Sequence, residues 1–91
     1  MAIRFDPGRC CATPAAVHEL AKNYVLADDL LDRHVNGDWG DLSYEDRLRN
    51  ELALVEMERV LSCYRVDENV KIYVVTDADR STTTVMLASE Y

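Results

Sequence analysis

The sequence has no run of eighteen consecutive apolar residues, and Arg4 already interrupts the apolar residues at its start. A membrane-spanning helix needs about 20 such residues, and the apolar part of a secretory signal needs roughly 7–15. We therefore expect a cytoplasmic protein.

Cysteine is also scarce. The three cysteines, Cys10, Cys11 and Cys63, cannot all pair, and the adjacent two lack the C-x-x-C spacing typical of zinc and redox sites. We predict no disulfide framework, no metal and no cofactor, and interpret the thiols as small buried hydrophobes or idle surface groups.

Several function-bearing motifs are missing. The chain has no P-loop, no dinucleotide glycine fingerprint, no G-x-S-x-G and no H-E-x-x-H. Its basic residues do not cluster with aromatic ones, so we expect no direct binding of nucleic acid and no membrane binding.

Acidic charge is what the chain has in excess. Residues 26–58 hold ten acids and three bases, which accounts for the whole net charge of −7, because seven acids and seven bases make up the rest. Such a field draws basic partners. The acidic surface expected to bind a partner comprises Asp28, Asp29, Asp32, Asp38, Asp41, Glu45, Asp46 and Glu51.

The length of 91 residues suits one domain, residues 1–91, and the apolar content of 48% is that of a chain that folds. A domain this small buries little surface, so its stability is expected to be modest and a homodimer is considered beside the monomer.

Three helices are expected before residue 60. Thr13 and Pro14 begin the first, Asn36 and Gly37 end a second over Ala27–Val35, and Ser43 caps a third over about 44–58. Trp39 is expected to fill the junction between the second and third helices. The apolar spacing predicts these inward residues: Val17, Leu20, Ala21 and Tyr24; Leu30, Leu31, His34 and Val35; Leu48, Leu52, Leu54, Val55, Met57 and Arg59.

From Val60 the apolar period changes to two. Residues 60–66, 70–76 and 82–87 are rich in β-branched and aromatic side chains and are joined by short turns. The expected fold is α+β, with three N-terminal helices packed on a three-stranded antiparallel β-meander.

Three candidate sites have structural alternatives. Asp32 to Gly37 follows the first half of a calcium loop, but the twelfth position is Ser43 instead of a bidentate Glu, so we interpret these carboxylates as a solvated face. His34 lies beside carboxylates that could raise its pKa, although a histidine near a helix C-terminus also stabilises that terminus. Arg80 and Ser81 could grip an anion, but the surrounding residues are typical of a turn. We assign no catalytic residue.

The run from His34 to Leu42, containing Gly37-Asp-Trp-Gly-Asp41, resembles the core of a family of short proteins found on bacterial plasmids, integrative elements and prophages. The resemblance covers residues 26–91, and further positions carry it: Glu45-Asp46, Asn50, Ala53-Leu54, Leu61-Ser62, Tyr64-Arg65, Ala78 to Ser81, Thr83 to Val85 and Glu90-Tyr91. The chain departs from the family before the second helix, where relatives tend to begin with Asp-Pro, and at Glu58, where glycine is common.

The resemblance implies a mobile-element context and brings no catalytic residues. Small acidic proteins of mobile elements include counter-defence proteins that occupy the basic grooves of CRISPR or restriction complexes, so by analogy we expect an inhibitor that acts by binding and is not an enzyme. The alternatives are a small enzyme, such as a nuclease-type toxin using His34, Arg80 and Ser81, and a structural or regulatory accessory protein.

Overall fold

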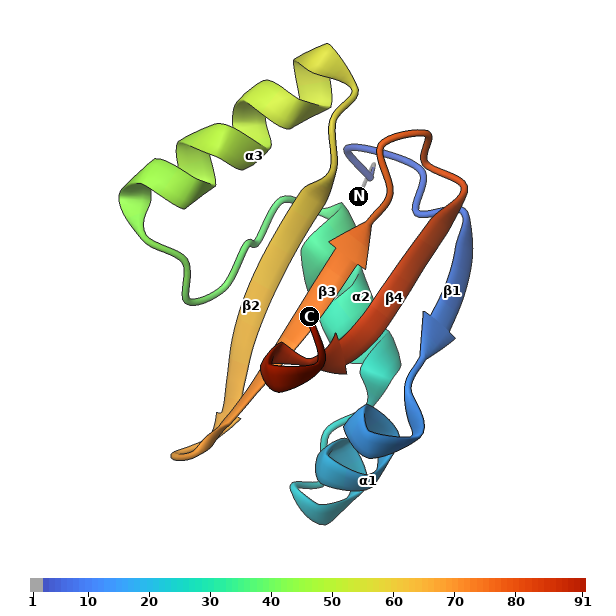
Figure 1. Cartoon of the computed structure of the whole chain (residues 1–91), viewed down its shortest axis with the longest axis vertical. Helices are drawn as coiled ribbons and strands as arrows, with labels where there is room; N and C mark the ends of the chain where they lie inside the picture. The colour runs from blue at the N-terminus through green and yellow to red at the C-terminus, as the bar shows by residue number, and fades with distance from the viewer. Residues whose placement is uncertain (1–2) are drawn as a thin grey trace.

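The computed structural model describes residues 3–91 and shows an α+β fold with three helices and one four-stranded sheet (Figure 1). The helices α1 (Pro14–Lys22) and α2 (Ala27–Val35) pack on one face of the sheet, and α3 (Tyr44–Glu56) lies beside its edge. The strands are β1 (Arg9–Ala12), β2 (Val60–Asp67), β3 (Val70–Thr76) and β4 (Thr82–Leu87), followed by the short 3-10 helix η1 (Ala88–Glu90).

The sheet has the order β1-β4-β3-β2. The three C-terminal strands pair antiparallel in sequence order, as expected. The expectation of a three-stranded antiparallel sheet was nevertheless incomplete, because β1 pairs with β4 in parallel and makes the sheet mixed. This fourth strand has the sequence Arg-Cys-Cys-Ala, which is short and lacks the β-branched residues that mark a strand.

The helix boundaries follow the capping residues that the sequence contains. The Thr13 hydroxyl accepts a hydrogen bond from the Ala16 amide at 3.1 Å, and the Ser43 hydroxyl accepts one from the Asp46 amide at 3.2 Å. Helix α2 has the predicted bounds, whereas α3 ends two residues earlier than predicted because Met57 adopts a left-handed conformation.

The main core lies between the sheet and the first two helices. Ala16 and Leu20 of α1 and Leu30 of α2 pack against buried residues of three strands: Tyr64, Ile72, Val74 and Val85. The predicted inward faces of α2, β3 and β4 are therefore confirmed, including Thr83, which is fully buried.

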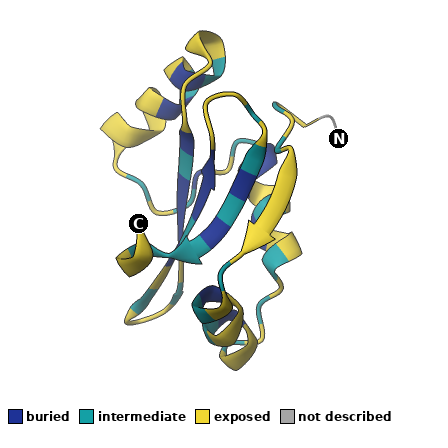
Figure 2. Cartoon of the chain, turned by 45° about the vertical axis from the view of Figure 1, so that its right-hand side comes forward, coloured by how far each residue is buried: buried dark blue, intermediate teal, exposed yellow. Residues whose placement is uncertain are grey.

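Two predicted inward faces were wrong. Helix α1 buries Ala16 and Leu20, while Val17 and Tyr24 are 51% and 97% exposed. Helix α3 buries Asn50 and Ala53 and leaves most of its predicted apolar stripe in solvent (Figure 2). Periodicity locates an apolar stripe on a helix but does not say that the protein covers it.

A pair of substitutions tests the observed rotation of α1. Leu20→Ala should lower the free energy of unfolding by about 2–5 kcal/mol because it removes buried methyl groups. Val17→Ala, on the same helix but half exposed, should change it by less than about 0.5 kcal/mol. Urea denaturation measures both values, and equal losses would contradict the observed packing.

Candidate functional site

The eight acidic residues expected to bind a partner fall into two structural groups. Five of them are exposed on the first turns or middle of helices: Asp28, Asp29 and Asp32 on α2, and Glu45 and Asp46 on α3. The start of α2 lies near α1, whereas the start of α3 lies on the opposite side of the view in Figure 1. The five exposed acids therefore form two patches.

The other three acids bond to other residues of the protein. Asp38 pairs with Arg33 at 2.7 Å, which lowers the pKa of the Asp38 carboxyl. Glu51 accepts hydrogen bonds from Arg4 and from the Trp39 indole, and these lower the pKa of its carboxyl. Asp41 accepts a hydrogen bond from a backbone amide of β2. Their first role is structural.

The loop that contains Gly37-Asp-Trp-Gly-Asp41 covers the outer edge of β2. The Cys63 amide donates to the Trp39 carbonyl at 3.1 Å, and the Cys63 carbonyl accepts from the Asp41 amide at 2.6 Å. One pleat further, the Asp41 carboxylate accepts from the Arg65 amide at 2.9 Å. The Trp39–Asp41 segment thus supplies the missing strand partner for this edge.

Asn50 on α3 completes this edge. Its side-chain amide donates to the Leu61 carbonyl at 2.7 Å, and its side-chain oxygen accepts from the Leu61 amide at 3.1 Å. A buried asparagine therefore pairs with Leu61 as the backbone of a neighbouring strand would. This pairing requires the side of α3 that carries the polar Asn50 and the small Ala53 to face the sheet.

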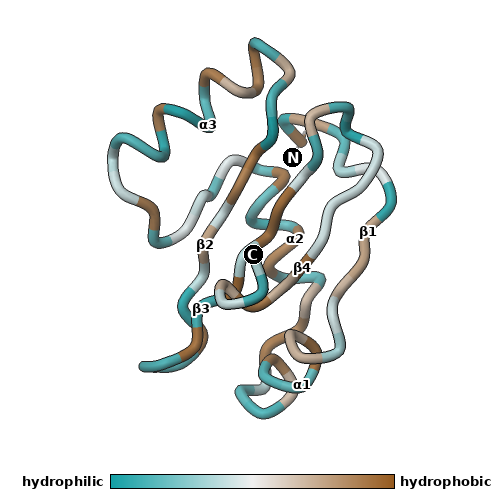
Figure 3. Tube along the Cα trace, viewed as in Figure 1, coloured by the Kyte–Doolittle hydropathy of each residue, from teal (hydrophilic) through white to brown (hydrophobic). Residues whose placement is uncertain are grey.

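The opposite side of α3 is apolar and exposed. Tyr44, Leu48, Leu52 and Val55 recur at helical spacing and are 74%, 50%, 53% and 80% exposed. Figure 3 shows hydrophobic positions recurring along α3, although the helix stands clear of the core between the sheet and α1 and α2. We call these four residues the α3 stripe. No sequence signal other than Asn50 distinguished this outward orientation from an inward one.

His34 belongs to a buried chain of hydrogen bonds. Its Nδ1 lies 2.6 Å from the Ser62 hydroxyl, its Nε2 lies 2.8 Å from the Thr76 hydroxyl, and Thr76 contacts the Thr83 hydroxyl at 2.6 Å. The Thr83 hydroxyl donates to the Pro7 carbonyl at 2.7 Å, and a carbonyl oxygen can only accept a hydrogen bond.

That last bond sets the direction of the whole chain. The Thr83 proton is used on Pro7, so Thr76 donates to Thr83, and Thr76 in turn accepts from Nε2–H of His34. In the neutral imidazole, Nδ1 then accepts the Ser62 hydroxyl proton. The bonds of this chain therefore place the proton of neutral His34 on Nε2.

Burial, and to a lesser extent the positive charge of Arg80, lowers the pKa of His34 from 6.5 to about 4. The sequence-based interpretation that neighbouring carboxylates raise this pKa is wrong, because Asp32 and Asp38 are exposed while the imidazole is completely buried. The side chain has no path to a substrate, and both ring nitrogens are occupied.

Arg80 and Ser81 take part in a turn. Ser81 donates to the Asp79 carboxylate through both its amide and its hydroxyl. The Arg80 guanidinium donates to the carbonyls of Ala53 and Glu58 and so caps the C-terminal end of α3. These contacts confirm the predicted turn and leave Arg80 engaged with backbone oxygens.

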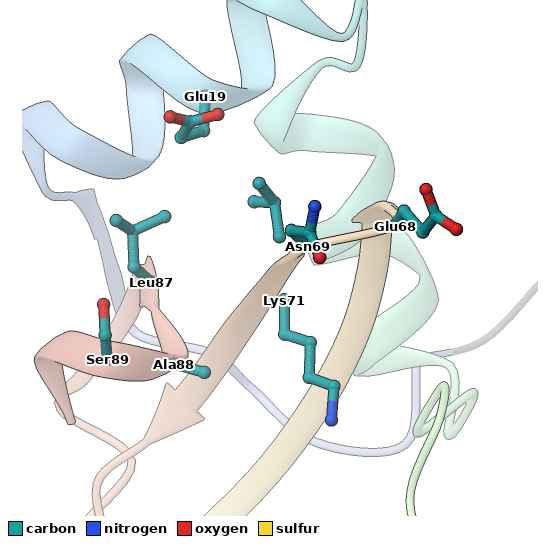
Figure 4. Close-up of a pocket in the computed structure, with 8 residues that line it drawn as sticks. Glu19, Glu68, Asn69, Lys71, Leu87, Ala88 and Ser89 are labelled. Atoms are coloured by element: carbon teal, nitrogen blue, oxygen red, sulfur yellow. The ribbon is translucent and has the colours of Figure 1, made fainter.

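Two of the open hollows on the surface of residues 3–91 are large enough to consider. One, of about 450 Å³, lies between the end of α1 and the start of β3, and in Figure 4 the ammonium group of Lys71 points away from Glu19. The other, of about 280 Å³, lies between α3 and the C-terminal segment. Its lining includes Arg49, Arg59, Tyr73 and Tyr91. The polar groups of the first hollow do not converge on a common point.

Within residues 3–91, no group of three or more His, Cys, Asp or Glu side chains is placed to hold a metal ion. None of the helices in the same part of the chain is long and apolar enough to cross a membrane. Comparisons of the chain with known family models, with curated proteins and with solved structures found no match. The candidate functional site comprises the α3 stripe and the two glutamates beside it, Glu45 and Glu56.

Gly40 provides a test of the cover over β2. Its φ is +76°, and a Cβ atom there would lie 2.0 Å from the Cys63 carbonyl oxygen. Gly40→Ala should lower the free energy of unfolding by about 1–3 kcal/mol because of the strained backbone conformation alone. The contact of the new Cβ with the Cys63 carbonyl should lower it further. Gly37→Ala is the matched control, because φ is also positive but the close neighbour is the flexible Arg4 side chain. Urea denaturation should show a clearly larger loss for Gly40→Ala.

The buried neutral His34 predicts a pH-dependent stability. Because the unfolded chain binds a proton at this residue below pH 6.5 and the folded protein does so only below about pH 4, stability falls on acidification through this window. The total loss is about 3 kcal/mol. His34→Gln should flatten the curve of unfolding free energy against pH between 6.5 and 4, whereas His18→Gln, on the exposed side of α1, should leave it unchanged. A parent protein with no slope in this window would contradict the assignment.

Proposed function

We propose that this protein acts by binding a protein partner through the α3 stripe and the adjacent acids. The partner is a bacterial defence nucleoprotein complex of the CRISPR or restriction type. The protein inhibits this complex, in the cytoplasm. The observation that carries the proposal is the outward orientation of the stripe. Small monomeric domains rarely expose a continuous apolar helix face, and such faces mark sites of association. The two leucines at the centre of the stripe, with Tyr44 at one end, suit the apolar core of an interface.

Two glutamates lie along one edge of the α3 stripe. Glu45 precedes Leu48 by three residues and Glu56 follows Leu52 by four, so each acid neighbours a leucine on the helix surface. Neither carboxylate has a hydrogen bond or ion pair with another residue in the part of the chain that the structure describes. An apolar strip with unpaired acids at its margin fits a partner whose apolar patch is bordered by lysine or arginine.

The net charge of −7 extends this complementarity over a longer range. A groove that binds nucleic acid is lined with basic residues, and an acidic domain approaching it is steered to the site. Occupying that groove would exclude the nucleic acid. The resemblance to mobile-element proteins supports a defence complex as the owner of the groove, by analogy and not by any single residue.

The alternative of a small enzyme receives less support from the geometry. Its three suggested residues serve other roles, since His34 is enclosed, Arg80 caps α3 and Ser81 closes a turn. A structural or regulatory accessory role would also use the α3 stripe, and the experiment below separates it from inhibition.

The protein should be expressed in bacteria that carry a defined CRISPR or restriction system, and plating of a phage targeted by that system should be measured. We expect plating to be restored with at least one system. The purified effector complex of that system should then bind the protein and lose its affinity for target DNA. An accessory protein would bind without restoring plating.

Four variants locate the interface. Leu48→Asp combined with Leu52→Asp should abolish inhibition, and Val17→Asp, which changes an equally exposed apolar residue on α1, should not. Glu45→Lys combined with Glu56→Lys should weaken binding by roughly tenfold or more at low salt, and less at high salt. Asp28→Lys combined with Asp32→Lys tests the other acidic patch and should have little effect. Inhibition that survives the two leucine substitutions in a folded protein would exclude the α3 stripe as the interface.

A further inference from the structure

The outer edge of β1 is uncovered. The Arg9 amide donates to the carbonyl of Ser81, which precedes β4, and the Thr13 amide donates to the Val85 carbonyl of β4, both at 2.9 Å. Because backbone groups alternate in direction along a strand, Arg9, Cys11 and Thr13 face β4, while Cys10 and Ala12 direct their N–H and C=O groups outward. No residue in the described range 3–91 bonds to those outward groups. Figure 2 shows the whole of β1 as exposed.

The two edges of the sheet differ in whether their outward backbone groups are hydrogen bonded. The β2 edge is closed by the Trp39–Asp41 backbone, the Asp41 carboxylate and the Asn50 amide. The β1 edge has no proline within the strand, no bulge and no covering loop among the described residues, so only its length of four residues and the charge of Arg9 oppose pairing. One edge is protected and the other can accept a strand.

The groups on the open edge are complementary to themselves. If a second β1 approaches antiparallel with Cys11 opposite Cys11, then Cys10 of each copy lies opposite Ala12 of the other. Both residues face outward, so each Cys10–Ala12 pair forms two N–H···O=C hydrogen bonds. These bonds use the two open N–H groups and the two open C=O groups of the pair. The two Arg9 side chains then lie at opposite ends of the paired strands, each across from Thr13, and do not repel each other closely.

We propose that two copies of this chain pair through their β1 strands in this register, forming one continuous eight-stranded sheet. The strand lengths favour a second copy as the occupant. Strand β1 comprises only the four residues between Pro7-Gly8 and Thr13-Pro14, so an incoming strand can pair over four residues at most. A second β1 offers a segment of this length with matching outward groups. The proposed dimer does not involve α3 and leaves the α3 stripe of each copy free.

The register makes a specific prediction for the cysteines. Cys11 aligns with Thr84 on the face of the sheet away from α1 and α2, and the two Cys11 residues form a non-hydrogen-bonded pair with Cα atoms about 4.5 Å apart. That separation lies within the range that a disulfide spans, roughly 4.4–6.8 Å. Cys10 aligns with the buried Thr83, points to the other face, and is diagonal to its counterpart at about 7–8 Å.

Sedimentation equilibrium of the reduced protein measures the association. We expect a mass approaching twice the 10.4 kDa of one chain as the concentration is raised. Ala12→Pro should return the mass to that of a monomer with its thermal transition retained, because the Ala12 amide does not bond to β4. Cys11→Pro is the contrasting variant: the Cys11 amide faces β4, so this change should lower the melting temperature.

Cross-linking tests the register without relying on proline. In a Cys10→Ser, Cys63→Ser background, diamide should oxidise the two Cys11 thiols to an intermolecular disulfide, taking up their two electrons and two protons. In a Cys11→Ser, Cys63→Ser background, the remaining Cys10 thiols should cross-link much more slowly.

Three outcomes would overturn the proposal. The first is a monomer mass at every concentration, and the second is preferential cross-linking through Cys10. The third is a dimer that survives Ala12→Pro but is lost on Leu48→Asp, which would show that two copies associate through α3.

Discussion

The outer edge of β2 is hydrogen bonded to a loop and to one side chain instead of to another strand, and the positions of the flanking elements depend on this. The Trp39–Asp41 segment follows the edge closely enough that only glycine fits at position 40. Trp39 is held there at 5% exposure, packed with Ala53 and Val60 beneath α3. Helix α3 is in turn fixed by Asn50 on Leu61 and by Arg80 at its C-terminal end.

This constraint explains why α3 faces solvent with its apolar side. Two hydrogen bonds to a strand edge require a polar side chain on the inner face, and close approach requires a small residue beside it, which is Ala53. With Asn50 and Ala53 turned inward, the leucines on the opposite side of the helix have no core to enter. An outward apolar face lowers solubility unless a partner covers it, which is why the proposed interface is placed on the α3 stripe.

Much of the fold could be predicted from residues whose effect is local. Thr13, Ser43 and Gly37 mark helix ends through their own side chains or backbone freedom, and the alternation in residues 70–76 identifies the inward face of β3. The features that were not predicted depend on contacts between residues far apart in the sequence. β1 is a strand only because residues 82–85 supply its partner, and the rotation of α3 follows from a bond between Asn50 and Leu61. The acidic region was identified correctly as a feature of the chain, but the internal roles of Asp38, Asp41 and Glu51 depend on Arg33, Arg65 and Arg4 and could not be read from composition.

The parallel pairing of β1 with β4 also has a kinetic consequence. Arg9 finds its partner in Thr82, 73 residues later, and the intervening chain forms all three helices and the hairpin of β2 and β3. During synthesis β1 therefore leaves the ribosome without a strand to join, and the sheet is closed only after residue 85 has emerged. Because bringing such distant segments together costs chain entropy before any contact compensates it, docking of β1 is expected to be a late step in folding, after the local hairpins and helices have formed.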